Sequence, residues 1–535
     1  EGYFEDLIRR FLIENNHRSI LVAVPKPGLG KKLEAKERKI LKEVKEQLPS
    51  DEIDNLIAET KKLQELQLTP DSPEALAKLP SLEIQDVPKE IEKYPLEIKS
   101  QGDSKILFHE LFTNGIAYTQ IGFNTESVPA EMIPYIPLLG TLMLGMGTNK
   151  HSYTEISKLI GMHTGGIRNS HFSSATVHDR HQVISYISFS GKALMEKVDN
   201  LFDVFDELLG EYSFDDHKRL IEIIRSAKSD MEDSIVPHGN HYVLARLQSY
   251  QSRLGKFDEI TDGITYYQFL EQLLERVEKN PEEVAGQFRQ VAERVFTRKN
   301  ALFNVTSDQK DYRKIEKRIV TTIGILSDKE WKVEEWNLTA VPLNEGFLTA
   351  SNVQHVGKGA NLYDLGFKHS GQFEVLKALL RTGFLWDKVR VHGGAYGSGN
   401  SFDYFTGDYS LLSYRDPNLV ETLGVYDEIA DFLNHLDLSS EELTKIIIGC
   451  VGKMDPPLTP DLKGKASMID HLTGRTHEMK QKLREELLST RLEDLKGYAP
   501  LFEKIKNKGH VCALGNEDKL KKSKSVFGQL VKVFH

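Results

Sequence analysis

The sequence predicts an α+β fold: two homologous domains, each an antiparallel sheet with helices on one face, preceded by a helical hairpin. Three observations lead to this prediction. A unit of helix, short polar turn and strand recurs three times, many other strands stand in neighbouring runs joined by short turns, and two amphipathic helices occur in a Lys/Glu-rich stretch. Strict alternation of strands and helices is absent. A chain of 535 residues holds about two to four domains.

The recurring unit marks the places where domains end, because repeats of this kind reveal the architecture of a chain. Its three copies are Tyr3–Asn15 with His17–Val24, Pro281–Phe296 with Ala301–Thr306, and Ala499–Lys506 with His510–Leu514. Each of the two later copies follows a whole domain's worth of sequence, whereas the first copy has nothing before it. We therefore expect residues 1–27 to be the closing helix and strand of a domain that lies upstream of Glu1, where an initiator methionine would otherwise stand.

Residues 28–95 differ in character from the rest of the chain. Lys31–Leu48 and Asp51–Leu68 each carry one apolar stripe at helical spacing in a dense Lys/Glu background, with Asp51 as a candidate N-cap. Four prolines follow within Thr69–Pro88, a density typical of an extended connector. We expect an antiparallel helical-hairpin linker with one solvated face, followed by the connector; a partner-binding coiled coil is the alternative.

The remaining blocks, residues 96–328 and 329–535, can be laid over each other. Strand Gly115–Phe123 aligns with strand Gly346–Val353, and each block then reaches a Gly-Gly pair that enters a strand and a polar cap that begins a helix. The glycine pairs are Gly165-Gly166 and Gly393-Gly394, and the caps are Ser213–Asp216 and Ser439–Glu442. The short turns also predict two hairpins, which pair Ile106–His109 with Ile116–Phe123 and Ile167–Ser173 with Val183–Phe189.

Composition excludes several classes of function. A net charge of −10 and a pI near 6.0 disfavour nucleic acid as a partner. No apolar run approaches the ~20 residues that span a bilayer, so we expect no membrane partner. Cys450 and Cys512 are too few for a disulfide framework or a Cys-rich zinc site, and we expect buried thiols in a reducing compartment.

No motif for a metal or a catalytic nucleophile is present. The short-spaced histidine pairs His178/His181 and His238/His241 lack the helical i,i+4 pairing with a nearby glutamate that zinc peptidases use. HExxH, HxxEH, GxSxG and phosphate-binding loops do not occur. We therefore expect no metal site in this chain and ordinary hydrogen-bonding roles for these histidines.

The segment Val389–Gly399 is the strongest candidate site. Four glycines within seven residues, among them Gly393 and Gly394, allow the backbone to approach a ligand closely. Arg390 brings a permanent charge and Tyr396 a hydroxyl on a rigid ring, and both can hydrogen-bond a peptide carbonyl or the oxyanion that forms when it is attacked. The alternative is a glycine-rich bulge or hairpin with a surface arginine and a packed tyrosine.

These residues resemble a known family. The chain is similar to the C-terminal part of the presequence protease and falcilysin group of the pitrilysin/insulinase superfamily of metallopeptidases. The resemblance extends over essentially the whole chain. It rests on Tyr3–Ile8 with Asn16–Arg18, on Pro73–Pro80, on Gly239–Tyr242 with Ala245-Arg246, on Gly263–Tyr266, and most specifically on Val389–Gly399.

The resemblance implies both a fold and a site. It implies two insulinase-like domains, the third (96–328) and fourth (329–535) of the family, after a helical-hairpin linker, in one of two bowl-shaped halves that close around a peptide. Zinc would be held by an HxxEH motif and a distal glutamate in the other, N-terminal half. Arg390 and Tyr396 match the pair that binds the substrate backbone and stabilises the tetrahedral intermediate, with Gly393 and Gly394 beside them as substrate-binding residues.

Two functions follow from this resemblance. In the first, the chain is the substrate-enclosing half of a zinc-dependent oligopeptidase that degrades unfolded peptides; its partners are peptides and the zinc-bearing half, and alone it binds no cofactor and is inactive. In the second, it is a natural non-catalytic binding or structural subunit. The unpartnered closing unit at residues 1–27 favours the first, since proteins avoid leaving an open strand edge. We expect a cytoplasmic location, with an organelle matrix as the alternative.

Overall fold

A computed structural model of the chain describes residues 2–24, 26–69, 71–76, 78–80, 82–341 and 343–534. They form two compact units, Glu1–Ser81 and Leu82–His535, so the division falls inside the predicted connector. Among the helices of the described residues, none has the length and apolar character that crossing a membrane requires.

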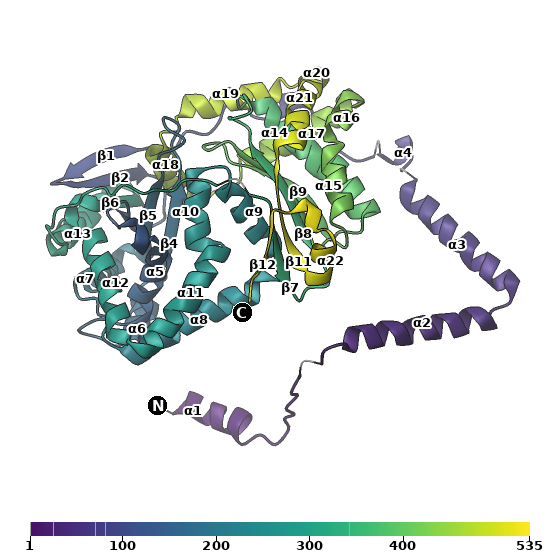
Figure 1. Cartoon of the computed structure of the whole chain (residues 1–535). Helices are drawn as coiled ribbons and strands as arrows, with labels where there is room; N and C mark the ends of the chain where they lie inside the picture. Colours follow the sequence, from purple (N-terminus) through teal and green to yellow (C-terminus); the bar gives the residue numbers. More distant parts are fainter. Residues whose placement is uncertain are drawn as a thin grey trace. The chain divides into compact units, whose positions relative to one another are not determined.

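Unit 1 consists of helices joined by irregular segments (Figure 1). They are α1 (Tyr3–Ile8), which continues as the π-helical turn Arg9–Ile13, α2 (Leu29–Gln47), α3 (Ser50–Leu68) and α4 (Pro73–Leu76). Helices α2 and α3 are the two predicted from the apolar stripes, although Pro49 rather than Asp51 stands at the N-cap of α3. Both stripes are open to solvent within this unit, as Leu41 and Leu66 show with exposures of 61% and 65%.

The strand predicted at His17–Val24 is not formed. These residues have no regular structure, and Leu21 is 94% exposed. A strand is held by hydrogen bonds to a neighbouring strand, and the described residues of unit 1 include none. The helix of this copy of the closing unit therefore forms, whereas its strand does not.

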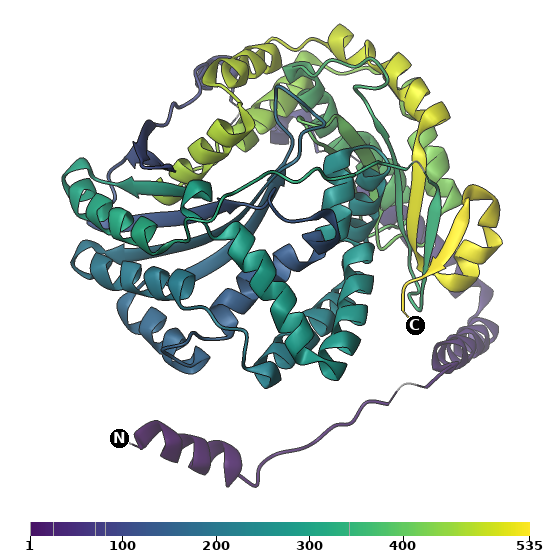
Figure 2. The ribbon, with the colours of Figure 1, turned by 60° about the vertical axis from the view of Figure 1, so that its left-hand side comes forward.

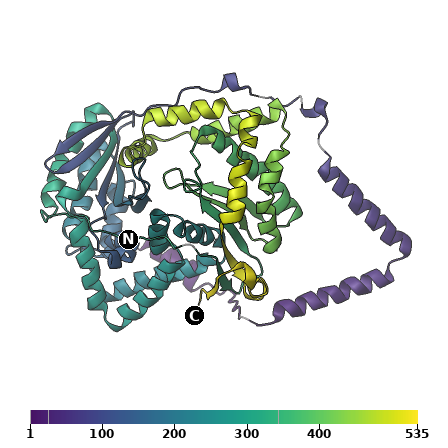
Figure 3. The same ribbon diagram turned by 45° about the horizontal axis from the view of Figure 1, so that its top comes forward.

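Unit 2 contains two six-stranded sheets (Figure 3). The first has the order β1-β2-β6-β3-β5-β4 and comprises β1 (Glu97–Gln101), β2 (Ser104–Glu110), β3 (Ile116–Asn124), β4 (Ile167–Ser174), β5 (Ile184–Leu194) and β6 (Ala301–Ser307). The second has the order β12-β7-β11-β8-β10-β9 and comprises β7 (Glu345–Thr349), β8 (His355–Asn361), β9 (Gly397–Phe402), β10 (Asp408–Tyr414), β11 (His510–Asn516) and β12 (Gln529–Lys532).

The two sheets repeat one topology. Strands β2-β6-β3-β5-β4 correspond in order and direction to β7-β11-β8-β10-β9, and the closing strands β6 and β11 occupy the same place. The α+β class and the closing units that end in β6 and β11 are confirmed. The sheets are mixed rather than purely antiparallel, because β6 runs parallel to β2 and β11 runs parallel to β7.

Two predictions about strand pairing are wrong. Strands β2 and β3 do not form a hairpin, because β6 inserts between them and pairs with both. The alignment of Gly115–Phe123 with Gly346–Val353 is displaced by one strand, since β3 corresponds to β8 and β7 corresponds to β2. The hairpin of β4 with β5 is confirmed over its whole length.

The helices of unit 2 follow the same division. Those of the first domain are α5 (Ile136–Gly145), α6 (Tyr153–His163), α7 (Val198–Gly210), α8 (His217–Ile235), α9 (Gly239–Ser249), α10 (Arg253–Asp262), α11 (Ile264–Lys279), α12 (Pro281–Val295) and α13 (Gln309–Ile325). Those of the second are α14 (Gly371–Leu379), α15 (Val420–Asp427), α16 (Ile429–Asn434), α17 (Ser440–Met454), α18 (Pro460–Thr473), α19 (His477–Leu488), α20 (Leu492–Lys496), α21 (Ala499–Lys508) and α22 (Glu517–Lys522).

Side chains alternate across the first sheet between an apolar and a polar face. Ile121 stands opposite Phe189 and Phe303 in the register, and these three side chains are buried in the core beneath the domain's own helices. Their chain neighbours Gln120 and Asn304 lie on the other face, because successive residues of a strand point to opposite sides. The polar face is thus the one that the first domain's own helices leave uncovered.

Each domain covers part of the other's second face with a helix. Met468 of α18 packs with Leu107 and Leu302 on the polar side of the first sheet, and Figure 2 shows helices on both sides of that sheet. In the other direction α9 lies on the second sheet, where a Cβ at Gly357 would come within 2.6 Å of Val243. The prediction that helices cover one face of each sheet therefore holds for the helices of the same domain. It does not foresee the helix that each domain places on the other domain's sheet.

The seam between the domains contains a buried charged cluster. The Arg246 guanidinium of α9 forms a bidentate pair with Glu345 of β7, at 2.5 Å from Nε and 3.0 Å from Nη2, and contacts Glu259 at 3.1 Å. Tyr250 donates to Glu345 at 2.5 Å, and both carboxylate side chains are fully buried. Although burial opposes ionisation, the hydrogen bonds from Arg246 and Tyr250 hold the pKa of Glu345 below its usual value. Arg246 thus ties the two domains together.

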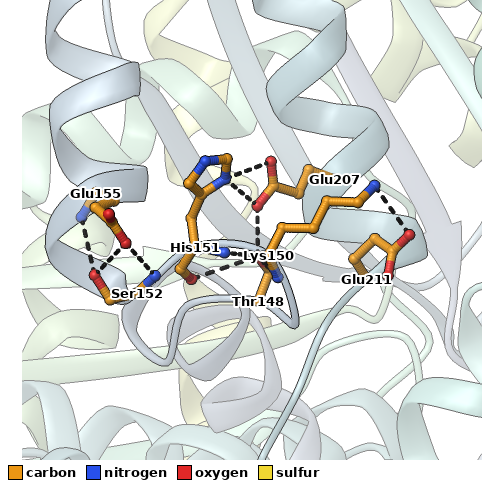
Figure 4. A network of polar contacts seen from close by, with 7 residues as sticks. All are labelled: Thr148, Lys150, His151, Ser152, Glu155, Glu207 and Glu211. Carbon is orange, nitrogen blue, oxygen red and sulfur yellow. Dashed lines mark hydrogen bonds and ion pairs between the residues drawn. The ribbon is translucent and has the colours of Figure 1, made fainter.

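A second polar network fixes the start of α6 (Figure 4). Ser152 caps the helix in a reciprocal arrangement with Glu155, and His151 Nδ1 lies 2.9 and 3.0 Å from the two carboxylate oxygens of Glu207. Thr148 also donates to Glu207, and Lys150 pairs with Glu211 at 3.0 Å. Because these groups satisfy one another, the cluster positions a loop and a helix.

Candidate functional site

The segment Val389–Gly399 begins in a helix and ends in a strand. Helix α14 passes into the π-helical stretches Leu380–Phe384 and Trp386–His392, in which Gly393 N donates to Lys388 O at 3.0 Å. Arg390 therefore lies on a π-helix, whereas Gly397 and Gly399 lie on β9, which forms a hairpin with β10 as the alternative predicted. π-Helices are rare and are frequent at functional sites.

The two glycines form the turn that leads out of this helix. Gly394 has φ +76°, a left-handed conformation that favours glycine. A Cβ at Gly393 would lie 2.5 Å from Val389 O, and the Gly393 carbonyl accepts from Asn418 Nδ2 at 2.6 Å. Of the two, Gly394 lines the adjoining pocket. The N–H groups of both glycines are hydrogen-bonded within the turn. The two glycines therefore contribute by placing Arg390 and Tyr396 on the same pocket.

An open pocket of about 650 Å³ receives both predicted side chains. Its walls are Trp386, Arg390, Val391, Gly394, Ala395, Tyr396 and Arg415. The Arg390 guanidinium carbon lies 3.8 Å from the centre of the Trp386 ring and 6.0 Å from that of Tyr396, in the range of cation–π attraction. Tyr396 rests edge-on against Tyr414, with the ring centres 5.6 Å apart. The structure thus brings Arg390 and Tyr396 together at one pocket.

The polar side-chain groups that line this pocket have no partner among the described residues. Within the described residues, no hydrogen bond or ion pair reaches the guanidinium of Arg390 or Arg415 or the hydroxyl of Tyr396, and the Tyr396 residue is 66% exposed. Two positive charges and a phenolic donor therefore face the same open space. Such donors suit an acceptor with partial or full negative charge, namely a peptide carbonyl, a carboxylate or an oxyanion.

Sequence reasoning missed two residues of the pocket, Trp386 and Arg415. Trp386 precedes Arg390 by one helical turn, a spacing that would have placed the two side chains together had a helix been expected there. Arg415 follows β10, and its positive φ of 48° places it in the left-handed region. No local pattern indicates that this residue meets Val389–Gly399.

The histidines and cysteines considered in the sequence do not line this pocket. Among the described residues, no group of three or more His, Cys, Asp or Glu side chains is placed to hold a metal ion. His241 lies 3.0 Å from Asp262, and the hydrogen bond to that carboxylate raises the pKa of His241. Cys450 and Cys512 are buried free thiols, and burial raises the pKa of Cys450 to about 11, which leaves it unreactive.

Comparison with known proteins finds two matching family models. The model for the region associated with subfamily C of the M16 peptidases matches residues 24–273. The model described as "PreP C-terminal domain" matches residues 344–517, a range that contains Arg390 and Tyr396.

Relatives match along the whole chain. Protein HypA of Clostridium perfringens is 34% identical over 532 residues, which cover 99% of this chain and 54% of that protein. Presequence protease 1, chloroplastic/mitochondrial, of Arabidopsis thaliana is 34% identical over 519 residues, 97% of this chain and 48% of that protein. The chain spans about half the length of these curated relatives.

Solved structures share the fold. The inactive domain of a peptidase M16 from Pseudomonas fluorescens matches with a TM-score of 0.57 and 14% identity, over 79% of this chain and 98% of that one. At this level of identity the likeness concerns the fold alone.

Proposed function

Because the chain belongs to the M16 peptidases, as a presequence-protease-like C-terminal half, we propose that it forms the substrate-enclosing wall of a zinc-dependent oligopeptidase that degrades unfolded peptides. The observation that carries the proposal is the pair Arg390 and Tyr396, which face one open pocket with no protein partner for their polar groups among the described residues. M16 peptidases act on peptides, are in general zinc-dependent and pair two halves. In this proposal the zinc is held by the other half, and this chain supplies substrate contacts.

The chain thereby binds and stabilises the substrate. Arg390 is held over Trp386 and donates charge-assisted hydrogen bonds to a substrate carbonyl. The Tyr396 hydroxyl donates to the same oxygen as its negative charge grows, and the exposed Trp386 ring offers an apolar surface beside it. Gly393 and Gly394 place these side chains and, at Gly394, offer backbone to the peptide. The metal supplies activation of the attacking water when both halves are present.

The names and sources of the relatives point to two different cellular locations. The relative from Arabidopsis is named as a chloroplastic/mitochondrial protein, whereas that from Clostridium belongs to a bacterium. We propose a bacterial cytoplasm for this chain, with an organelle matrix as the alternative.

Peptide binding at the pocket is expected to be visible through Trp386. Titrating an unstructured peptide of about 20 residues into the purified chain should change its tryptophan fluorescence, and Trp386→Phe should remove that change. Arg390→Ala should weaken the peptide Kd by about 10- to 100-fold, the effect of losing hydrogen bonds from a charged donor. An unchanged Kd in Arg390→Ala would overturn the role of this residue.

The purified chain alone is expected to bind no zinc stoichiometrically and to cleave no peptide, because its described residues offer no three-ligand cluster. Elemental analysis after dialysis against a weak chelator, with a fluorogenic peptide assay on the same sample, tests both points. One tightly bound zinc per chain, or cleavage that a strong chelator abolishes, would contradict the assignment of the metal to the other half. Peptide binding in a full-length protein that never cleaves would favour the non-catalytic subunit instead.

A further inference from the structure

A second cleft, of about 300 Å³, lies on the polar face of the first sheet. Strands β3, β4, β5 and β6 form its floor, and the first turns of α18 from the second domain form one wall. The side chains that carry its chemistry are Tyr118, Gln120, Arg168, Lys192, Asp461 and Lys465. The cleft therefore exists only when the two domains of unit 2 are packed together.

Strand register explains why these side chains share one face. Tyr118 stands opposite Lys192, Gln120 stands opposite Ser190, and Arg168 stands opposite that same serine. Residues directly opposite in neighbouring strands project on the same side of a sheet. Helix α18 covers the neighbouring part of this face through Met468, so the polar rows beyond it are left open beside a protein wall.

The cleft holds more donors and positive charge than the protein itself uses. Gln120 is only 7% exposed, yet its side-chain amide makes no hydrogen bond within the described residues. Arg168, Lys192 and Lys465 likewise form no ion pair there. Asp461 is the one carboxylate among the lining residues, and it accepts from Thr459 at 2.6 Å. Donors and positive charges that gather in one open cleft suit a ligand with acceptor oxygens and negative charge.

The position of the cleft repeats that of the Arg390 pocket in the other domain. Strand β4 is the edge strand of the first sheet as β9 is of the second, and the pairs Gly165-Gly166 and Gly393-Gly394 precede these two strands. Gly165 and Gly166 line the cleft, just as Gly394 lines the pocket. The duplicated fold thus places an open, positively charged depression at the start of each edge strand.

We propose that this cleft binds a carboxylate of the enclosed peptide, either its C-terminal group or an acidic side chain. Arg168 of β4 and Lys465 of α18 pair with the carboxylate oxygens, and Gln120 donates from β3. The inference rests on the proposed function, because it needs a peptide bound along this side of the chain, and it adds a preference that the Arg390 pocket alone does not supply.

Four versions of one unstructured peptide test the proposal with the purified chain at low ionic strength. They end in a carboxylate or a carboxamide and carry a single Glu or Gln near the middle, and each Kd is measured by fluorescence anisotropy. We expect the preferred carboxylate form to bind about 10-fold tighter than its neutral counterpart. The pair in which the difference occurs identifies the source of the carboxylate.

Arg168→Gln with Lys465→Gln should abolish this preference and leave binding of the fully neutral peptide unchanged. Lys445→Gln, which removes an exposed charge on α17, should keep the preference. A preference that survives in the double variant, or equal binding of all four peptides to the unaltered chain, overturns the carboxylate site while the proposed function stands. If none of the four peptides binds, both fall together.

Discussion

In the proposed two-half enzyme, replacing Tyr396 by phenylalanine should lower kcat by about 10²–10³ and leave KM nearly unchanged. An effect of this size is typical of removing one hydrogen-bond donor to a tetrahedral oxyanion. The substitution keeps the ring and its edge-on contact with Tyr414, and it removes only a hydroxyl that has no hydrogen bond within the described residues. Steady-state kinetics with a fluorogenic peptide measure both parameters.

The split between kcat and KM follows from where the charge develops. The carbonyl oxygen of the bound substrate is neutral, and water can donate to it almost as well as the Tyr396 hydroxyl can. The oxyanion is charged, so it gains more from a donor that is held in place. Loss of the hydroxyl therefore raises the energy of the transition state more than that of the bound substrate. A rise in KM at constant kcat would instead show that Tyr396 contributes only to peptide binding.

A neighbouring tyrosine provides the matched control. Tyr414→Phe removes the hydroxyl of the ring against which Tyr396 rests, a ring that does not line the pocket, and it should change kcat by less than about threefold. Equal losses in the two variants would mean that the effect arises from altered packing. A Tyr396→Phe protein with normal kcat would remove this residue from the catalytic machinery altogether.

Parts of the fold that depend on neighbours in sequence could be predicted. The closing pairs α12 with β6 and α21 with β11 are separated by only a few residues, and their helical and strand patterns are local. The β4–β5 hairpin is likewise set by alternation on either side of one connection. Capping at Asp216 and Ser439 follows from side chains that bond amides three residues ahead.

Parts of the fold that depend on segments far apart in the sequence could not be predicted. Strand β6 lies between β2 and β3 because a segment much later in the chain inserts there. Nothing in the sequence of Ile106–Phe123 indicates this insertion. The mutual covering of the sheets by α9 and α18 is a property of two domains together. For the same reason the cleft beside α18 was not foreseeable from any one stretch of sequence.

The candidate site also has features that the sequence could predict and features that depend on the fold. The density of glycines beside an arginine and a tyrosine indicated Val389–Gly399, because these residue types fit a backbone turn and an anionic acceptor. The π-helix that holds Arg390, and the approach of Arg415 from the end of β10, depend on how α14, β9 and β10 pack. Residue chemistry was thus visible in the sequence, whereas the convergence on one pocket required the fold.

Replacing Arg246 by methionine should lower the free energy of unfolding by about 3–5 kcal/mol, the usual result of leaving buried charges without their partner. The variant keeps an unbranched apolar side chain in the seam and removes the guanidinium that contacts Glu345 and Glu259. Both carboxylates are fully buried, so water cannot replace the lost bonds. Urea unfolding followed by circular dichroism measures the change.

A surface ion pair gives the matched comparison. Arg225→Met breaks the pair with Glu278, whose side chains are 57% and 46% exposed, and should cost at most about 1 kcal/mol. Similar losses in the two arginine variants would show that the seam is far wetter than its burial implies. Adding Glu345→Gln and Glu259→Gln to Arg246→Met should recover part of the loss, because neutral amides are cheaper to bury than unpaired carboxylates.

The seam variant also connects the two sites described above. Arg246 belongs to α9 and Glu345 to β7, so the pair holds the first domain against the second. The carboxylate cleft takes its floor from one domain and a wall from the other, whereas every wall of the Arg390 pocket comes from the second domain. In an Arg246→Met chain kept below its unfolding transition, the preference for carboxylate peptides should therefore weaken before the fluorescence response of Trp386 does. The opposite order would mean that the cleft does not depend on this contact between the domains.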